Sequence, residues 1–257
     1  MPRRIGPVSH EDRLSLVEHL DELRSRLIVC AASFGVALAL CFWQNHLLLE
    51  IASGPLPSNH KLLLTFGVTE PFTTTLTVAA YGAIILSLPV LLYQAYAYIL
   101  PAFSDKERRT VLPIMLMAPV LFLAGVAFAY FIVMPAAVKF LLNFNDNQFN
   151  VQLRARDYYS FFSTTMLAGG IVFQLPLGIL AVTKLGIVSI AQLRSNRRYA
   201  YLVIALAAAA LPGVDPVSML IEMVPLLALY ELSILLARAF GRPKAAGGTA
   251  QPSTQER

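Results

Sequence analysis

The chain has 257 residues and a formal net charge of +5, and 57% of its residues are hydrophobic while only 14% are charged. An average soluble domain carries about 25% charged residues, so a soluble fold of this length would have too few charges to cover its surface. The composition therefore excludes an ordinary soluble protein and predicts a membrane protein. No basic tract with interleaved aromatic residues is present, so we expect no nucleic-acid partner.

Six apolar runs predict six transmembrane helices. In chain order they cover residues 27–43, 72–100, 111–134, 159–185, 199–211 and 217–237. Four runs reach the length of about 20 residues that a spanning helix needs, the first is slightly shorter and the fifth is clearly short. The fifth run covers roughly 20 Å of a hydrocarbon core near 30 Å, so it needs flanking residues or a thinner bilayer. The pattern predicts an all-α polytopic membrane protein.

The distribution of positive charge predicts the orientation of these helices. Sixteen of the 20 Lys and Arg residues lie before the first run, between the second and third runs, between the fourth and fifth runs, or after the sixth, when Lys184 at the end of the fourth run is counted with the connection that follows it. Because Lys and Arg are enriched in cytoplasmic loops, we expect both termini to be cytoplasmic. The chain then divides into a cytoplasmic N-terminal segment (1–26), a membrane domain (27–238) and a disordered cytoplasmic tail (239–257) rich in small and polar residues.

Prolines inside the predicted spans indicate bent helices. They are Pro89, Pro113, Pro119, Pro176 and Pro225. Each removes a backbone hydrogen bond and tends to kink its helix. We therefore expect a kinked, concave bundle instead of a tight parallel one.

A cluster of charges precedes the first run. Ser15 and Glu18 fit a capping box, and leucines then recur at helical spacing, which predicts an amphipathic helix that leads into the first span. On this helix Glu22 and Arg26 are four residues apart with the acid first, an arrangement that stabilises a helix by only about 0.2–0.5 kcal/mol. The cluster could thus be a simple helix-stabilising pair that anchors the topology.

A second charged cluster, SDKERR at 104–109, links the second and third runs on the same predicted side. It too could be a charged turn that orients two helices. Together, however, the two clusters put Glu22 and Glu107 on one face of the membrane. Paired carboxylates in such a setting could receive an arginine ligand through bidentate bonds.

Polar residues at membrane depth are few, and they are Gln174, Glu222 and Glu231, with Asp215 at the predicted outer turn between runs five and six. Such groups are costly in lipid and commonly functional, so we expect Gln174 and Glu231 to serve function or partner contact, while Glu222 could lie near the outer headgroups. The histidines lie outside the apolar runs or at their edge, and HExxH is absent. We expect no metal and no cofactor.

A series of motifs runs through the chain in a fixed order. These are HLDELRSRL before the first run, EPF at 70–72, LPVLLYQAYAYILPAFSDKERR at the end of the second run, FAYFIVMP at the end of the third, FQLP in the fourth and the hairpin at 215–231. Over residues 15–238 this series resembles the TatC family, the multispanning receptor of the twin-arginine protein translocase.

The resemblance implies a function. TatC-like proteins bind the twin-arginine signal peptides of folded precursors on the cytoplasmic side. With single-span TatA or TatB partners they start export driven by the proton motive force, across a bacterial-type cytoplasmic membrane and in a multimeric receptor complex. No covalent chemistry is implied, so we expect a protein that is not an enzyme.

The resemblance also assigns residues. Two acids match the family's glutamates that engage the arginine pair, two arginines match its Glu-Leu-Arg-x-Arg run, and two further residues match the adjoining recognition patch. In that order they are Glu22 and Glu107, Arg24 and Arg26, and Tyr98 and Pro101.

The chain departs from the family pattern at three places. Gln174 stands where the family commonly has a glutamate, and Leu-Pro-Gly-Val precedes Asp215 in place of the more usual Thr-Pro. Glu222 is not an acid of the pattern. We hypothesise that Glu222 supplies an intramembrane carboxylate that this chain otherwise lacks in its outer half.

Two other functions remain as alternatives at this stage. A proton-coupled secondary transporter of a small solute could use Glu222 and Glu231 as a proton site, although the sequence has no internal repeat of the kind common in transporters. An intramembrane protease would need a nucleophile and base or a metal, yet no predicted span contains a histidine and no GxSxG occurs.

Overall fold

The computed structural model describes residues 10–58, 62–99, 105–144, 147–148, 151–184, 187–210 and 216–240. The description leaves out the side chains of residues 10–18, 99, 105–115, 184, 210, 218, 239 and 240. The elements are α1 (His10–Trp43), α2 (Asn45–Ser53), α3 (Glu70–Ile99), α4 (Asp105–Phe128), the π-helix η3 (Ala129–Val133), α5 (Met134–Asn143), α6 (Ala155–Val172), α7 (Leu175–Lys184), α8 (Ile190–Ser195), α9 (Arg197–Ala210) and α10 (Pro216–Phe240). Within these ranges the all-α prediction is confirmed.

Five helical stretches of the described chain are long and apolar enough to cross a membrane. They are His19–Trp43, Glu70–Tyr98, Leu116–Asn143, Ala155–Thr183 and Met219–Arg238. They match every predicted span except the fifth. That run forms α9, whose 14 residues rise only about 21 Å, so the predicted count of six spans is not confirmed.

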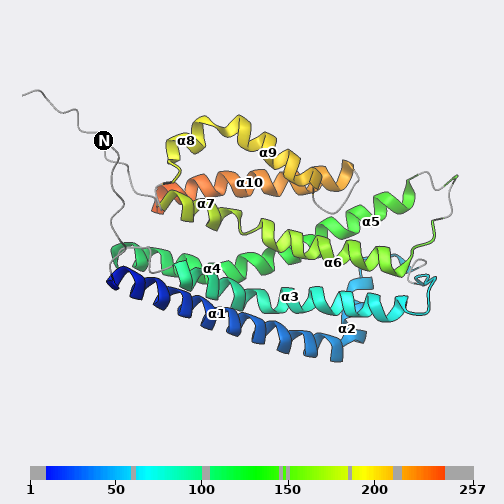
Figure 1. Cartoon of the computed structure of the whole chain (residues 1–257). Helices are drawn as coiled ribbons and strands as arrows, with labels where there is room; N and C mark the ends of the chain where they lie inside the picture. Colours follow the sequence, from blue (N-terminus) through cyan, green and yellow to red (C-terminus); the bar gives the residue numbers. More distant parts are fainter. Residues whose placement is uncertain are drawn as a thin grey trace, which may run out of the picture.

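The helices form an elongated bundle (Figure 1). α1 packs along α3, α6 packs against both α3 and α4, and α10 packs against α7 and α9. α1 and α4 begin, and α3 and α10 end, at one end of the bundle, which we call the charged end; α2 and the start of α6 lie at the other, the α2 end. The hairpin of α9 and α10 stops short of the start of α6 (Figure 1).

α1 is one continuous helix of 34 residues. The predicted amphipathic segment and the first span are therefore not separated by a bend. Because the helix is continuous, the residues before position 27 form a rigid extension of the first span beyond its apolar run. Glu22 and Arg26 lie on that extension.

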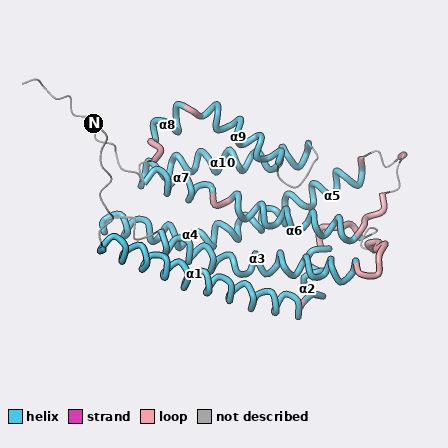
Figure 2. The backbone as a smooth tube through the Cα atoms, in the orientation of Figure 1, coloured by secondary structure: helices cyan, strands magenta, loops and turns pink. Residues whose placement is uncertain are grey.

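The predicted kink at Pro176 is confirmed, because the fourth span divides there into α6 and α7 (Figure 2). Proline has no N–H with which to continue the helical ladder. The chain turns through Phe173 and Gln174, where Gln174 N donates to Ile171 O at 2.9 Å and Gly178 N resumes the ladder by donating to Gln174 O at 3.0 Å. Gln174 consequently sits at a break in the helix.

The third span ends differently from the sequence prediction, since helical structure continues past residue 134 to Asn143. Pro135 would normally end the helix, but a π-helical turn over Ala129–Val133 precedes it, and Met134 N donates to Ala129 O across that wider turn. Such single π-turns accommodate local disruption of the α-helical ladder. The helix thereby passes the proline without ending.

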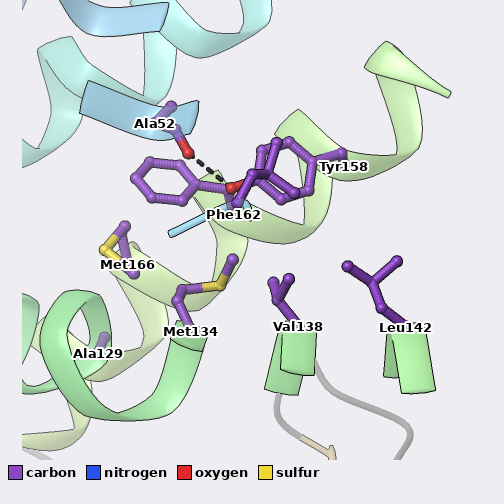
Figure 3. Packing of buried hydrophobic residues seen from close by; sticks show 9 residues of the cluster. Ala52, Ala129, Met134, Val138, Leu142, Tyr158, Phe162 and Met166 are labelled. Atoms are coloured by element: carbon purple, nitrogen blue, oxygen red, sulfur yellow. Dashed lines mark hydrogen bonds between the residues drawn. The ribbon is translucent and has the colours of Figure 1, made fainter. Parts of the chain in front are cut away.

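The α2 end is held by a buried cluster that joins α2, α5 and α6 (Figure 3). The Tyr158 hydroxyl donates to the Ala52 carbonyl at 2.7 Å, and Phe162, Met134 and Met166 pack around it. α2 follows directly after α1, so this hydrogen bond ties the end of the first span to the fourth.

An ion pair closes the same end. Arg154 binds Glu70 through two bonds, Nε to Oε1 at 2.7 Å and Nη2 to Oε2 at 3.2 Å, and its guanidinium lies 5.5 Å from the centre of the Phe66 ring. The Glu70 carboxylate raises the pKa of the Arg154 guanidinium. A short β-bridge between Leu64 and Arg154 connects the same two segments, so the loops before α3 and α6 form one unit.

Glycines allow α4 and α6 to approach closely. A Cβ atom added at Gly125 would overlap the Gly169 carbonyl oxygen and lie 2.9 Å from Cβ of Phe173, and one added at Gly170 would overlap the Phe122 ring. Small residues at crossings let membrane helices pack backbone to backbone. The contact fixes α6 just before the break at Phe173.

We expect Gly125→Ala to lower the melting temperature of the detergent-purified protein, because overpacking of this kind costs about 1–3 kcal/mol. Gly178→Ala is the matched control, since a Cβ there meets nothing within 4 Å and alanine favours the helix. A Gly125→Ala protein as stable as the control would show that the crossing is not tightly packed.

Candidate functional site

Three polar side chains meet at the charged end, between the start of α1 and the end of α3. The Arg26 guanidinium donates to Glu22 Oε1 through Nε at 3.0 Å and through Nη2 at 2.6 Å. Its remaining terminal nitrogen, Nη1, donates to Gln94 Oε1 at 3.0 Å. One guanidinium therefore bonds to acceptors from two helices.

An aromatic pair borders this group. The rings of His19 on α1 and Tyr98 on α3 stack with their centres 4.5 Å apart and their planes at 14°. His19 Nδ1 lies 3.9 Å from Glu22 Oε2, so the two form an ion pair only when the imidazole is protonated. The stack gives the site a flat apolar wall beside its carboxylate.

The structure brings together three of the residues predicted to bind the signal peptide, namely Glu22, Arg26 and Tyr98. Arg24 is exposed on the same helix. Glu107 lies in the first turn of α4, at the same end of the bundle, although its side chain is outside the description. Pro101 lies outside the described residues.

Gln94 and His19 also belong to this site, although neither was predicted from the sequence. Residues three and four apart share a helix face, and on that rule His19, Glu22 and Arg26 form one row on α1 while Gln94 and Tyr98 form another on α3. The spacing of these residues within each helix can be read from the sequence. The register of α1 against α3, which makes the two rows face each other, cannot.

The predicted intramembrane residue Gln174 contacts α4. Its Nε2 donates to the Ala118 carbonyl at 3.1 Å, across the crossing of α4 and the break between α6 and α7. Its buried Oε1 has no hydrogen-bond partner in the part of the chain that the structure describes. Gln174 thus links α4 to the break between α6 and α7 through its amide nitrogen alone.

Glu231 is a paired acid between α9 and α10. Arg197 Nη2 donates to its Oε2 at 2.7 Å, and the Tyr201 hydroxyl donates to its Oε1 at 2.8 Å. The Glu231 side chain is 39% exposed, so both bonds are open to the surroundings. The pairing joins α9 to α10 and offsets the cost of a carboxylate next to lipid.

Glu222 is buried, with 7% of its surface exposed. It lines a small cavity of about 20 Å³ between η3, α6 and α10, together with Thr165 and Phe173. That volume is close to the space of one water molecule. Asp215, the fourth predicted polar residue, lies outside the described residues.

A larger cavity of about 590 Å³ opens between α1, α2, α3, α4, α6 and η3. Its walls are almost entirely apolar and include Tyr81, Pro89, Phe131 and Met166. Its size and apolar lining suit an extended apolar segment.

Within the described ranges, no three His, Cys, Asp or Glu side chains are grouped so as to hold a metal ion.

Comparison with known proteins gives a consistent result. The profile of the family described as Sec-independent protein translocase protein (TatC) matches residues 18–225. The chain is 35% identical to the Sec-independent protein translocase protein TatC of Desulforapulum autotrophicum over 91% of this chain and 88% of that protein. It is 34% identical to the TatC protein of Aquifex aeolicus over 90% of this chain and 98% of that protein.

The same family appears among solved structures. A crystal structure titled Twin Arginine Translocase Receptor TatC superimposes with a TM-score of 0.74 at 33% sequence identity. The match covers 87% of this chain and the whole of that one. Fold and sequence similarity therefore extend over nearly the full bundle.

Gln174→Leu should change the melting temperature little. The substitution removes the bond to Ala118, a net loss of about 0.5–1.5 kcal/mol, but it also removes a buried oxygen that has no partner among the described residues. Thermal unfolding of the detergent-purified protein measures the balance. A large drop would show that the Gln174 amide contributes more than this single bond.

Proposed function

Because the chain belongs to the TatC family of Sec-independent protein translocases, we propose that it is the receptor subunit of a twin-arginine translocase. In this role it binds the twin-arginine signal peptides of folded precursors and starts their export, which the proton motive force drives. The observation that carries the proposal is the group at the charged end, where Glu22 already holds a guanidinium.

The proposed docking site uses the charge-assisted chemistry of that group. Glu22 and Glu107 accept hydrogen bonds from the two signal-peptide arginines, and Arg24 and Arg26 limit the negative charge of the empty site. Tyr98 and Pro101 form the adjoining apolar patch. Arginine suits such a site better than lysine because its planar fork meets a carboxylate through two bonds.

The cavity of about 590 Å³ supports a second part of the proposal. A signal peptide continues beyond its arginines into an apolar segment, and this cavity is apolar and opens along the same bundle. In the proposed complex the apolar segment lies in the cavity. Membrane lipid occupies it when no cargo is bound.

The membrane arrangement remains a proposal as well. We infer six spans with both termini cytoplasmic, in a bacterial-type inner membrane. The charge distribution supports the orientation, and the packing of α9 along α10 supports a final hairpin of two spans, in which the short α9 requires a locally thin bilayer.

The proposed partners are single-span TatA- or TatB-type subunits and further copies of this chain in a multimeric receptor complex. A helical partner in lipid is recognised by close packing and by polar side chains at the interface. Gln174, Asp215, Glu222 and Glu231 are the proposed polar contacts. Glu231 supports this role because its carboxylate is partly exposed.

Glu107→Ala should abolish export of twin-arginine cargo while the protein remains inserted. The lost bonds to a charged group are each worth about 1.5–3 kcal/mol. Export is measured by the appearance of a folded reporter beyond the membrane in cells with only this variant. Normal export would exclude Glu107 from the docking site.

Photocrosslinkers at positions 98 and 107 should label a signal peptide that carries two arginines much more strongly than the same peptide with two lysines. The reason is that lysine cannot form the bidentate bond. Equal labelling of the two peptides would indicate that both charged clusters only orient the helices in the membrane. Solute uptake by liposomes that contain only this protein would then favour the alternative of a proton-coupled transporter.

Glu222→Gln tests the hypothesis that this acid supplies an intramembrane carboxylate in the outer half of the bundle. We expect weaker copurification of the single-span partners and reduced export, because the amide keeps the size of the side chain but cannot carry its charge. Unchanged export and unchanged assembly would remove Glu222 from the proposed contacts.

A further inference from the structure

Arg26 occupies the charged end in the way a ligand arginine would. It engages Glu22 with Nε and Nη2 and Gln94 with Nη1, so all three of its nitrogens donate. Only 24% of its side chain is exposed. Arg24, two residues earlier on the same helix, is exposed. The acceptors around Arg26 thus form a seat for one guanidinium, with a carboxylate on one side and an amide oxygen on the other.

Gln94 has a chemical property that the acids lack. Its amide oxygen accepts a hydrogen bond without adding negative charge. It therefore stabilises a donor in the correct position, whereas it attracts a positive charge without that geometry only weakly. The guanidinium fork carries donors on three nitrogens in one plane and reaches Glu22 and Gln94 at once. An ammonium group is a compact point charge, which the carboxylate attracts but the paired geometry does not favour.

The bond between Arg26 and Glu22 is also of a kind that can exchange. The two residues are four apart on one helix, and the Glu22 side chain is 36% exposed. Partly exposed pairs of this type are weak. An incoming guanidinium that replaces Arg26 would re-form the same bonds, so the carboxylate never loses a partner during the exchange.

We propose that Glu22 and Gln94 form a guanidinium-specific subsite, which Arg26 fills in the empty protein and which one arginine of the signal peptide takes over on binding. Gln94 is then a specificity residue of the docking site, and Arg26 is an internal competitor. This inference rests on the proposed function and names the means by which the site distinguishes arginine from lysine.

The competitor has a clear consequence for selection. A basic segment that lacks arginine has to displace a guanidinium with a less suitable group. Only a ligand that restores both the carboxylate bonds and the Gln94 bond exchanges without loss. The filled subsite therefore rejects general basic peptides, which a bare acidic site would attract.

A simpler role is possible for the same bonds, namely a structural link between α1 and α3. That role predicts that removal of the Gln94 oxygen lowers thermal stability and leaves ligand selectivity unchanged. The proposed role predicts a change in selectivity. The ratio of affinities for two peptides separates the two roles, because a general loss of stability weakens both peptides together.

Gln94→Leu removes one net hydrogen bond from both the empty and the occupied subsite, so the affinity of the full chain in nanodiscs for a fluorescent twin-arginine signal peptide should change little. The affinity for the twin-lysine version should rise by about threefold to tenfold, because that peptide no longer has to displace the bond between Arg26 and Gln94. Gln94→Glu, which keeps the acceptor oxygen but adds negative charge, should also reduce the preference for arginine. Gln152→Leu, the same change at an exposed position near the α2 end, is the matched control and should behave as wild type.

Arg26→Lys tests the exchange itself. Lysine keeps the charge but gives up the fork that reaches Gln94, so both peptides should bind about threefold more tightly or better, because each displaces the same weakened competitor. Unchanged or weaker binding of the twin-arginine peptide by a folded Arg26→Lys protein would overturn the role of Arg26 as a competitor.

The outcomes also separate this inference from the proposed function. If wild-type protein prefers arginine and Glu107→Ala abolishes that preference, but Gln94→Leu does not alter the affinity ratio, the docking site stands and the subsite is wrong. If wild-type protein shows no preference for the twin-arginine peptide, the proposed function itself fails.

Discussion

Satisfaction of the backbone in lipid is the constraint on which this fold depends. A peptide group without a hydrogen bond is costly in hydrocarbon, so the apolar runs form helices, and every proline inside them requires a local remedy. At Pro135 the remedy is a π-turn that carries the helix onward, whereas at Pro176 the helix breaks and turns through Gln174. The same constraint thus lengthens one span and bends another, and it brings the amide of Gln174 against the carbonyl of Ala118.

Features that depend on neighbours in the chain could be predicted from the sequence. The long apolar runs, the kink at Pro176 and the location of Glu22 and Arg26 on one helical face all follow from composition and spacing. The end of the third span could not be predicted, because a proline normally ends a helix and the π-turn before Pro135 has no clear sequence signal. The run that forms α9 was predicted as a span, but its 14 residues rise only about 21 Å, less than the thickness of the hydrocarbon core.

Contacts between segments far apart in the chain could not be predicted from the sequence, for a different reason. Glu70 and Arg154 are 84 residues apart, and Arg26 and Gln94 are 68 apart. Each pair depends on how whole helices lie against one another, which a single sequence does not encode in any local pattern. The resemblance to TatC named Glu22 and Tyr98, but the structure was needed to add Gln94, since only the register of α1 against α3 brings its amide to the guanidinium.

The two ends of the bundle differ in how firmly their polar groups are held. At the α2 end the Tyr158 hydroxyl is buried in its bond to Ala52, and Glu70, 6% exposed, accepts a bond from Arg154 on each of its two carboxylate oxygens. At the charged end Glu22 and Arg26 are partly exposed and join through a pair that spans a single helical turn. Buried bonds resist exchange because their partners cannot be replaced by water, whereas half-exposed bonds exchange readily. A rigid cap at one end and exchangeable contacts at the other fit the proposed receptor function, because a ligand can then enter from one side without loosening the helices that form the walls.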